Sequence, residues 1–112
     1  AFTNPDLETM YQELVYNGNV FGEDGMFSLK AALLVGALIE EVDILDLEDT
    51  INASAHDDII QTYENLQKGS RNHLRSFVRQ LENMGIVYEA RVMESSDYDA
   101  IVNSPMERGR TR

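Results

Sequence analysis

Two neighbouring carboxylates and one imidazole are the side chains in this sequence with the clearest potential for chemistry. Glu40 and Glu41 each interrupt an apolar stripe that repeats every three or four residues, and His73 interrupts a similar stripe later in the chain. Carboxylate oxygens and imidazole nitrogens that project inward from facing helices bind iron or manganese in helical bundles. We therefore predict a metal site with Glu40 and His73 as ligands and Glu41 as an alternative ligand.

Three further residues could support these ligands. Asp43 lies about one turn beyond Glu40, where it can orient a ligand or remain solvated. Tyr63 could donate a hydrogen bond to a metal-bound carboxylate or serve as a packing aromatic. Ser70 lies on the same stripe as His73, three residues before it. The simpler alternative for the whole set is a solvated glutamate pair and a hydrogen-bonded histidine, because an unpaired buried charge is unfavourable.

The spacing of apolar residues predicts two long helices that position these side chains. One runs from Ser28 to about Thr50 and the other from about Asp57 to Asn83, so residues 28–84 form a hairpin that packs antiparallel. The first helix carries two neighbouring stripes: Leu33, Ala37, Glu40, Ile44, Leu47 and Ile51, and Leu34, Leu38, Glu41, Leu45 and Glu48. The second helix carries Ile59, Tyr63, Leu66, Ser70, His73, Phe77 and Leu81.

The register of this hairpin brings an acid and an imidazole together. If the turn is centred near Ser54, Glu40 and His73 are offset by five residues, which is roughly 7.5 Å along the axis. Helical side chains tilt toward the N-terminus of their own helix. In an antiparallel pair this tilt moves the two side chains toward each other, so we predict that they converge.

Shorter elements are predicted on both sides of the hairpin. Residues 1–18 form a short helix, because Pro5 is typical of a first helical turn. Residues 86–112 form a C-terminal extension whose short helix ends near Val102 and whose tail frays from Pro105. The 112 residues then make one all-α domain.

Composition excludes several classes of function. The chain carries 20 acidic and 9 basic residues, so its formal net charge of −11 argues against nucleic acid or an anionic membrane as a partner. The absence of cysteine excludes disulfides and thiolate metal sites. The longest apolar run, Ala31–Ile39, is shorter than the ~20 residues of a spanning helix. The sequence begins without a signal-peptide pattern, which predicts a cytoplasmic protein by default.

Charge is divided unevenly along the hairpin. Residues 40–64 contain nine acidic residues and no lysine or arginine, whereas residues 68–79 contain only basic charge. Arg71, Arg75 and Arg79 lie four residues apart and predict a basic outer strip. A two-helix hairpin buries little apolar surface. We therefore expect it to dimerise or to be part of a larger bundle.

The same residues resemble a known family. Three segments are similar to an uncharacterised ferritin-like family, catalogued as a domain of unknown function, and the Gly-Ser-Arg-Asn-His stretch is fairly specific. The segments are Val35-Gly36-Ala37-Leu38-Ile39-Glu40-Glu41-Val42-Asp43-Ile44 with Asp46-Leu47, then Tyr63-Glu64-Asn65-Leu66 with Gly69-Ser70-Arg71-Asn72-His73-Leu74-Arg75, and Tyr98-Asp99-Ala100-Ile101-Val102 with Asn103-Ser104-Pro105.

The resemblance implies half of a four-helix bundle related to ferritins and rubrerythrins. Family members carry two earlier helices with a Glu and a Glu-x-x-His, so this chain resembles the C-terminal half alone. The third-helix acid of the family falls on Glu40 or Glu41, and its fourth-helix histidine falls on His73. Ser70 stands where ferritin-like proteins have a bridging Glu, a departure that puts a standard di-iron centre in doubt.

The expected function is therefore metal binding, linked to iron redox chemistry or storage in a complete bundle. The expected cofactor is a divalent metal, iron first, with manganese or zinc as alternatives. The partner is a second copy in a homodimer, or the missing N-terminal half, and a two-fold dimer would supply two Glu40 and two His73 side chains. No catalytic residue is assigned. The alternative is a non-catalytic dimerisation module whose acidic stripe pairs with the basic strip of another copy.

Overall fold

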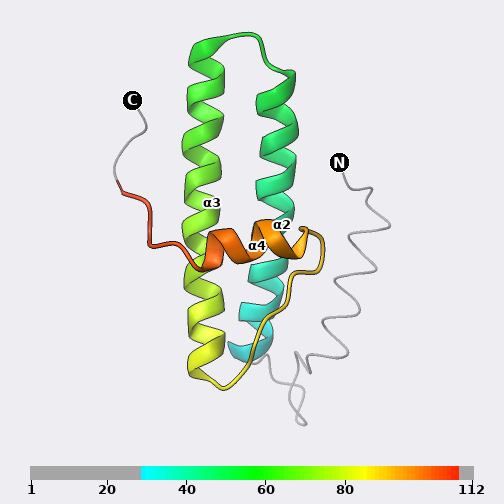
Figure 1. Cartoon of the computed structure of the whole chain (residues 1–112), viewed down its shortest axis with the longest axis vertical. Coiled ribbons are helices and arrows are strands. Elements are labelled where there is room, and N and C mark those ends of the chain that lie inside the picture. Colours follow the sequence, from blue (N-terminus) through cyan, green and yellow to red (C-terminus); the bar gives the residue numbers. More distant parts are fainter. Residues whose placement is uncertain (1–28, 109–112) are drawn as a thin grey trace.

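The computed structural model describes residues 29–108, and within this range the chain forms helices and no strand. The long helices α2 (Leu29–Ala53) and α3 (Asp57–Asn83) pack antiparallel, and the short helix α4 (Ser95–Val102) runs across them (Figure 1). The predicted all-α class and the helical hairpin are confirmed. The predicted helix of residues 1–18 lies outside the described residues.

The helix ends follow local sequence signals. Helix α3 begins at the predicted residue, where Asp57 and Asp58 place negative charge in the first turn and so complement the helix dipole. Helix α2 extends three residues beyond its expected end at Thr50. There the Ser54 N–H donates to the Ile51 carbonyl oxygen at 3.2 Å and closes the last turn.

The core draws apolar side chains from every described helix and from the segment after α3. Both predicted stripes of α2 contribute. The segment after α3 adds Tyr88 and Met93, and α4 adds Tyr98. Gly36 permits a close approach of the two long helices, since a Cβ at this position would lie 3.1 Å from the Phe77 ring. The buried α2 and α3 members of the core are Leu33, Leu34, Ala37, Leu38, Val42, Ile44, Leu74, Val78 and Leu81.

The stripe predicted to face α2 from α3 is wrong in its first half. Ile59 is 41% exposed and Leu66 is 53% exposed. Gln67 occupies the facing position instead, where its amide nitrogen donates to the Ile44 carbonyl oxygen at 3.0 Å and to a Glu48 carboxylate oxygen at 2.9 Å. The buried position in this part of α3 therefore differs from the predicted one, and the buried amide of Gln67 has its hydrogen bonds satisfied there.

A glycine ends α3 and turns the chain back along the hairpin. Gly85 has φ +79°, a left-handed conformation that suits glycine because it has no Cβ. Its N–H donates to the Glu82 carbonyl oxygen, and the Ile86 N–H donates to that of Leu81, both at 2.9 Å. These two bonds form a Schellman motif, which satisfies carbonyl groups that the helix end would otherwise leave free.

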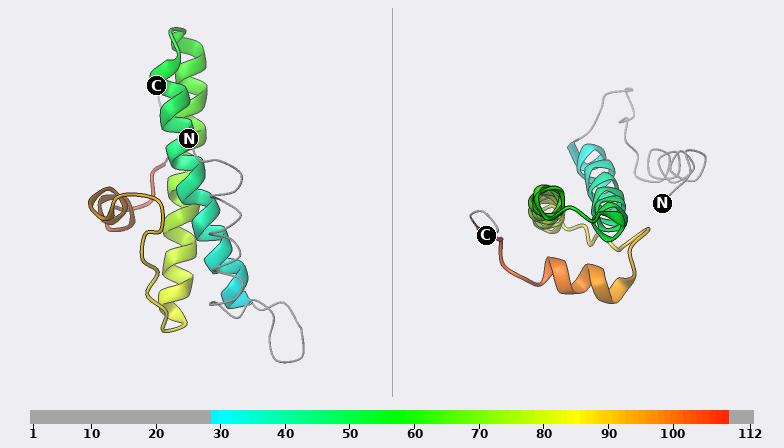
Figure 2. Two further views of the ribbon diagram at one scale, coloured as in Figure 1. Left: turned by 90° about the vertical axis from the view of Figure 1, so that its right-hand side faces the viewer. Right: turned by 90° about the horizontal axis from the view of Figure 1, so that it is seen from above.

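Helix α4 forms a second layer over one face of the hairpin (Figure 2). Tyr98 is its buried residue, and its ring lies 6.1 Å from that of Tyr88 at an interplanar angle of 52°. The Tyr98 hydroxyl donates to the Tyr88 carbonyl oxygen at 2.8 Å. Helix α4 is thereby fixed to the segment that precedes it as well as to α3.

Glu41 is a fully buried carboxylate that fastens this segment to α2. It accepts the Tyr88 hydroxyl at 2.5 Å and the backbone N–H groups of Arg91, Val92 and Met93 at 3.0–3.1 Å. Four donors replace the water that the carboxylate loses on burial, which makes a buried charge tolerable. Burial, followed by the hydrogen bond to Glu41, raises the pKa of Tyr88, so its hydroxyl stays a donor.

A second carboxylate fastens the C-terminal segment to α3. Glu107 accepts hydrogen bonds from Arg71 at 2.7 Å and lies 2.9 Å from Arg75. These guanidinium groups lower the pKa of Glu107 to about 2. The predicted fraying from Pro105 is therefore wrong as far as Glu107, and two arginines of the predicted outer strip are engaged within the molecule.

Among residues 29–108, no helix combines the length and the apolar character needed to cross a membrane.

Replacing Glu41 with alanine should strongly destabilise the fold. The variant leaves a buried hydroxyl and several backbone N–H groups without an acceptor, so the free energy of unfolding should fall by at least about 3 kcal/mol. Urea denaturation followed by circular dichroism measures this change. Glu89→Ala is the matched control, because Glu89 lies in the same segment with an exposed side chain and its loss should change stability by less than about 0.5 kcal/mol. Equal effects of the two variants would contradict the role of Glu41.

Candidate metal-binding groove

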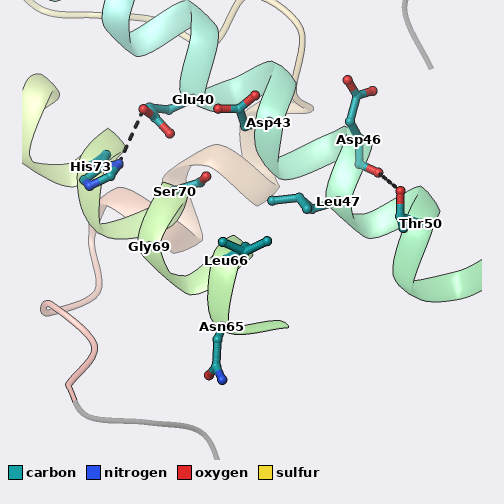
Figure 3. Close-up of a pocket in the computed structure, with 10 residues that line it drawn as sticks. All are labelled: Glu40, Asp43, Asp46, Leu47, Thr50, Asn65, Leu66, Gly69, Ser70 and His73. Carbon is teal, nitrogen blue, oxygen red and sulfur yellow. Dashed lines mark hydrogen bonds and ion pairs between the residues drawn. The ribbon is translucent and has the colours of Figure 1, made fainter. Parts of the chain in front are cut away.

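An open groove of about 550 Å³ lies between the two long helices (Figure 3). All of its lining residues come from α2 and α3. Its lining combines acids and small polar residues with two leucines, and none of the lining side chains is lysine or arginine. The lining residues are Glu40, Asp43, Asp46, Leu47, Thr50, Asn65, Leu66, Gly69, Ser70 and His73.

Glu40 and His73 meet at one end of this groove (Figure 3). The His73 Nδ1 atom lies 3.5 Å from the Glu40 Oε2 atom. The Glu40 side chain is 13% exposed and the His73 side chain is 66% exposed, so the acid is sheltered and the imidazole is open to solvent. The predicted convergence of these two side chains is confirmed, because the tilt of side chains in antiparallel helices offsets their difference in register.

Burial sets the electrostatics of the groove. Desolvation raises the pKa of Glu40 above its ordinary value, and the charge of Asp43 raises it further, whereas His73 and a hydrogen bond with Ser70 lower it. The pKa of Asp43 is also raised, first by burial and then by the charge of Asp46. The groove therefore holds acids whose negative charge is less well stabilised than it would be in water. A bound cation would relieve this cost.

The predicted supporting residues divide between two places. Asp43 and Ser70 line the groove beside Glu40 and His73. Tyr63 does not, because it lines a separate surface hollow near the interhelical turn, with Asp49 and other residues. Asp43 and Ser70 are thus close enough to Glu40 and His73 to influence their orientation.

Glu41 does not reach this groove. Its oxygens accept hydrogen bonds from Tyr88 and from the segment that follows Tyr88, on a different face of α2. Consecutive helical residues point about 100° apart, so α2 directs Glu40 and Glu41 to different surroundings. Glu41 therefore has a role in the fold, and the structure does not bring it together with Glu40 and His73.

Two of the groove residues that were not predicted as part of a site are informative. Asp46 follows Asp43 by three residues, as Asp43 follows Glu40, and this spacing is the signal that places all three acids on one helical face. Leu66 was predicted to lie in the core. Within residues 29–108 no group of three or more His, Cys, Asp or Glu side chains is arranged to hold a metal ion.

Comparison with known proteins identifies the family. The family described as "Uncharacterized protein domain (DUF2202)" matches residues 1–105, and the chain belongs to this family. The uncharacterized protein MJ0754 of Methanocaldococcus jannaschii is 45% identical over 112 residues, which are 100% of this chain and 57% of that protein. The chain thus spans little more than half the length of this relative.

A solved structure supports the fold. The crystal structure of hypothetical protein MJ0754 from Methanococcus jannaschii is similar with a TM-score of 0.71 and 44% sequence identity. The match covers 96% of this chain and 57% of that one.

The raised pKa of Glu40 predicts that this acid reduces stability at neutral pH in the absence of metal. A raised carboxyl pKa contributes stability only at low pH, and that contribution is lost as the pH rises through the folded-state value. Glu40→Gln should therefore melt at a higher temperature than the unmodified chain at pH 7, and the difference should disappear near pH 3. Thermal unfolding with EDTA present measures both. Glu89→Gln, an exposed control, should show no such pH-dependent difference. A lower melting temperature for Glu40→Gln at pH 7 would contradict this prediction.

Proposed function

We propose that this chain contributes Glu40 and His73 as two ligands to a divalent-metal site in a ferritin-like helical protein. The observation that carries the proposal is the 3.5 Å separation of His73 Nδ1 and Glu40 Oε2 in an acidic groove. Ligands from facing antiparallel helices are the arrangement by which helical bundles bind iron and manganese.

The separation of the two atoms is suitable for shared coordination. A tetrahedral ion with ligand bonds of about 2.1 Å holds neighbouring ligand atoms about 3.4 Å apart. The observed distance of 3.5 Å differs little from this value. Either nitrogen of an imidazole can bind a metal, and the exposed ring of His73 has room to turn. Little rearrangement of the two side chains is therefore needed.

The charges around the pair also support cation binding. Glu40 is sheltered, and no lysine or arginine lines the groove to neutralise it. Asp43 and Asp46 add negative charge along the same face of α2. His73 is the only lining side chain that can become positive, so the negative charge of the three acids is poorly compensated. A divalent ion in the groove would therefore stabilise several acids at once.

Completion of the site requires ligands beyond this pair. A second copy related by a two-fold axis would bring another Glu40 and another His73, and further chain of a longer protein could supply other carboxylates. The exposed Leu66 at the groove gives such a partner apolar surface to cover. Oxygen and imidazole donors suit iron, manganese or zinc. We favour iron because the sequence resemblance implies a relation to ferritins and rubrerythrins.

The alternative is a dimerisation module without metal. The exposed leucine in the groove favours it, whereas Arg71 and Arg75 pair with Glu107 in the same molecule and have less capacity to attract an acidic stripe of another copy. This alternative predicts a dimer that persists in the presence of a chelator. The metal-binding proposal predicts a response to metal that depends on His73.

Metal titration with matched histidine variants tests the proposal. Saturating Zn²⁺ should raise the melting temperature of the chain by about 5 °C or more, because a ligand that binds only the folded state stabilises it. His73→Ala should abolish this rise. His56→Ala removes the only other histidine, an exposed residue at the start of α3, and should preserve it. Fe²⁺ under anaerobic conditions should behave in the same way.

Two outcomes would contradict metal binding at this pair. The first is an equal Zn²⁺ response in the two histidine variants, which would indicate binding elsewhere. The second is a melting temperature of the unmodified chain that does not change with Zn²⁺, together with light scattering that shows the same dimer with and without EDTA. This result would favour the dimerisation module.

A further inference from the structure

Three side chains of α3 engage every polar atom of one acidic residue. Arg71 donates from Nε and Nη2 to the two carboxylate oxygens of Glu107, each at 2.7 Å. The Arg75 Nη2 atom lies 2.9 Å from one of these oxygens. Asn72 pairs with the backbone, because its Nδ2 donates to the Glu107 carbonyl oxygen and its Oδ1 accepts the Glu107 N–H, both at 2.9 Å. The Arg71–Asn72–Arg75 cluster thus recognises both a carboxylate and the peptide that carries it.

Contacts that do not involve Glu107 hold this cluster in place. Arg75 donates to the Ile101 carbonyl oxygen at 2.8 Å and to Asn72 Oδ1 at 2.8 Å, and its side chain is 4% exposed. Arg71 donates to Gln67 Oε1 at 3.2 Å. The donors would therefore keep their positions if Glu107 moved away. A binding group that is already ordered loses less entropy on binding.

The segment that carries Glu107 is otherwise exposed. Helix α4 ends at Val102, and residues 103–106 are all exposed to solvent. The contacts of Glu107 are thus the main polar attachment of this segment to α3. Removal of Glu107 would leave the buried guanidinium of Arg75 without its carboxylate, and an uncompensated buried charge is unfavourable.

We propose that the Arg71–Asn72–Arg75 cluster is a docking site for an irregular, acidic peptide segment of a partner protein, and that residues 103–108 of this chain occupy it as a tethered competitor. The partner contributes an aspartate or glutamate in a non-helical segment. Two guanidinium groups bind its carboxylate and the Asn72 amide binds its backbone.

The chemistry of the cluster favours a peptide over a free anion. Asn72 presents both a donor and an acceptor to the N–H and carbonyl groups of a single residue. An inorganic anion has no N–H to donate to Asn72 Oδ1. A bidentate guanidinium contact, in turn, fits the two oxygens of a carboxylate.

Binding of a short peptide to a vacated cluster tests this proposal. The probe is an N-terminally labelled, amidated peptide with the sequence of residues 103–108, followed by fluorescence anisotropy. Because the tethered segment competes at an effective concentration on the order of millimolar, the full chain with Glu107→Ala should bind the probe at least tenfold more tightly than the unmodified chain. A probe with Gln in place of its Glu should bind at least tenfold more weakly to the variant.

Matched arginine variants separate recognition from general attraction. Arg71→Ala added to Glu107→Ala should abolish probe binding. Arg79→Ala added to the same variant should not, because Arg79 is exposed on the same helix and is not part of the cluster. The chain has a net charge of −11, and the Gln probe carries one negative charge fewer than the Glu probe. Non-specific electrostatics therefore favours the Gln probe, so a preference for the Glu probe cannot come from non-specific charge. Equal binding of the two probes to the folded Glu107→Ala chain, or no binding, would overturn the proposal.

A measurement on the unmodified chain covers the possibility that Glu107→Ala does not fold. Excess unlabelled probe should displace the tethered segment and shift the methyl resonance of Met106, which is 38% exposed in that segment. The buried Met93 methyl group provides the internal control. No shift of the Met106 resonance at probe concentrations of several times the effective concentration would overturn the proposal.

Discussion

The buried carboxylate of Glu41 is the interaction on which the arrangement of this protein depends. It is fully buried, and its hydrogen bonds to Tyr88 and to the N–H groups that follow hold the segment after α3 against α2. This contact fixes which face of α2 is directed inward. Because consecutive helical residues diverge by about 100°, it also fixes Glu40 on the groove side, where His73 approaches from α3.

The two faces of the hairpin differ in how fully their charged side chains are compensated by hydrogen bonds. On the face covered by α4 and the C-terminal segment, Glu41, Arg75 and Glu107 have their hydrogen bonds satisfied within the molecule. In the groove, the pKa of Glu40 is raised because its burial is only partly offset by His73 and Ser70. Poorly stabilised acids occur at functional sites as well as in structural networks, so this feature of Glu40 fits the cation-binding role proposed for the groove.

Much of the helical hairpin could be predicted from the sequence, and much of the polar network could not. The extent of α3 and the meeting of Glu40 with His73 follow from helical periodicity and antiparallel geometry. The role of Glu41 depends on donors about fifty residues away in a segment without periodicity. The exposure of Leu66 was missed because its spacing is that of a core residue, whereas Gln67 takes the position facing α2.

The most direct test of the metal-binding account is the response of the two histidine rings to Zn²⁺ in two-bond ¹H–¹⁵N correlation spectra of the unmodified chain. The account predicts that the ring nitrogens of His73 shift on titration to values typical of a metal-bound imidazole, while those of His56 do not change. A spectrum in which the His73 nitrogens stay constant, or in which both rings shift alike, would contradict it.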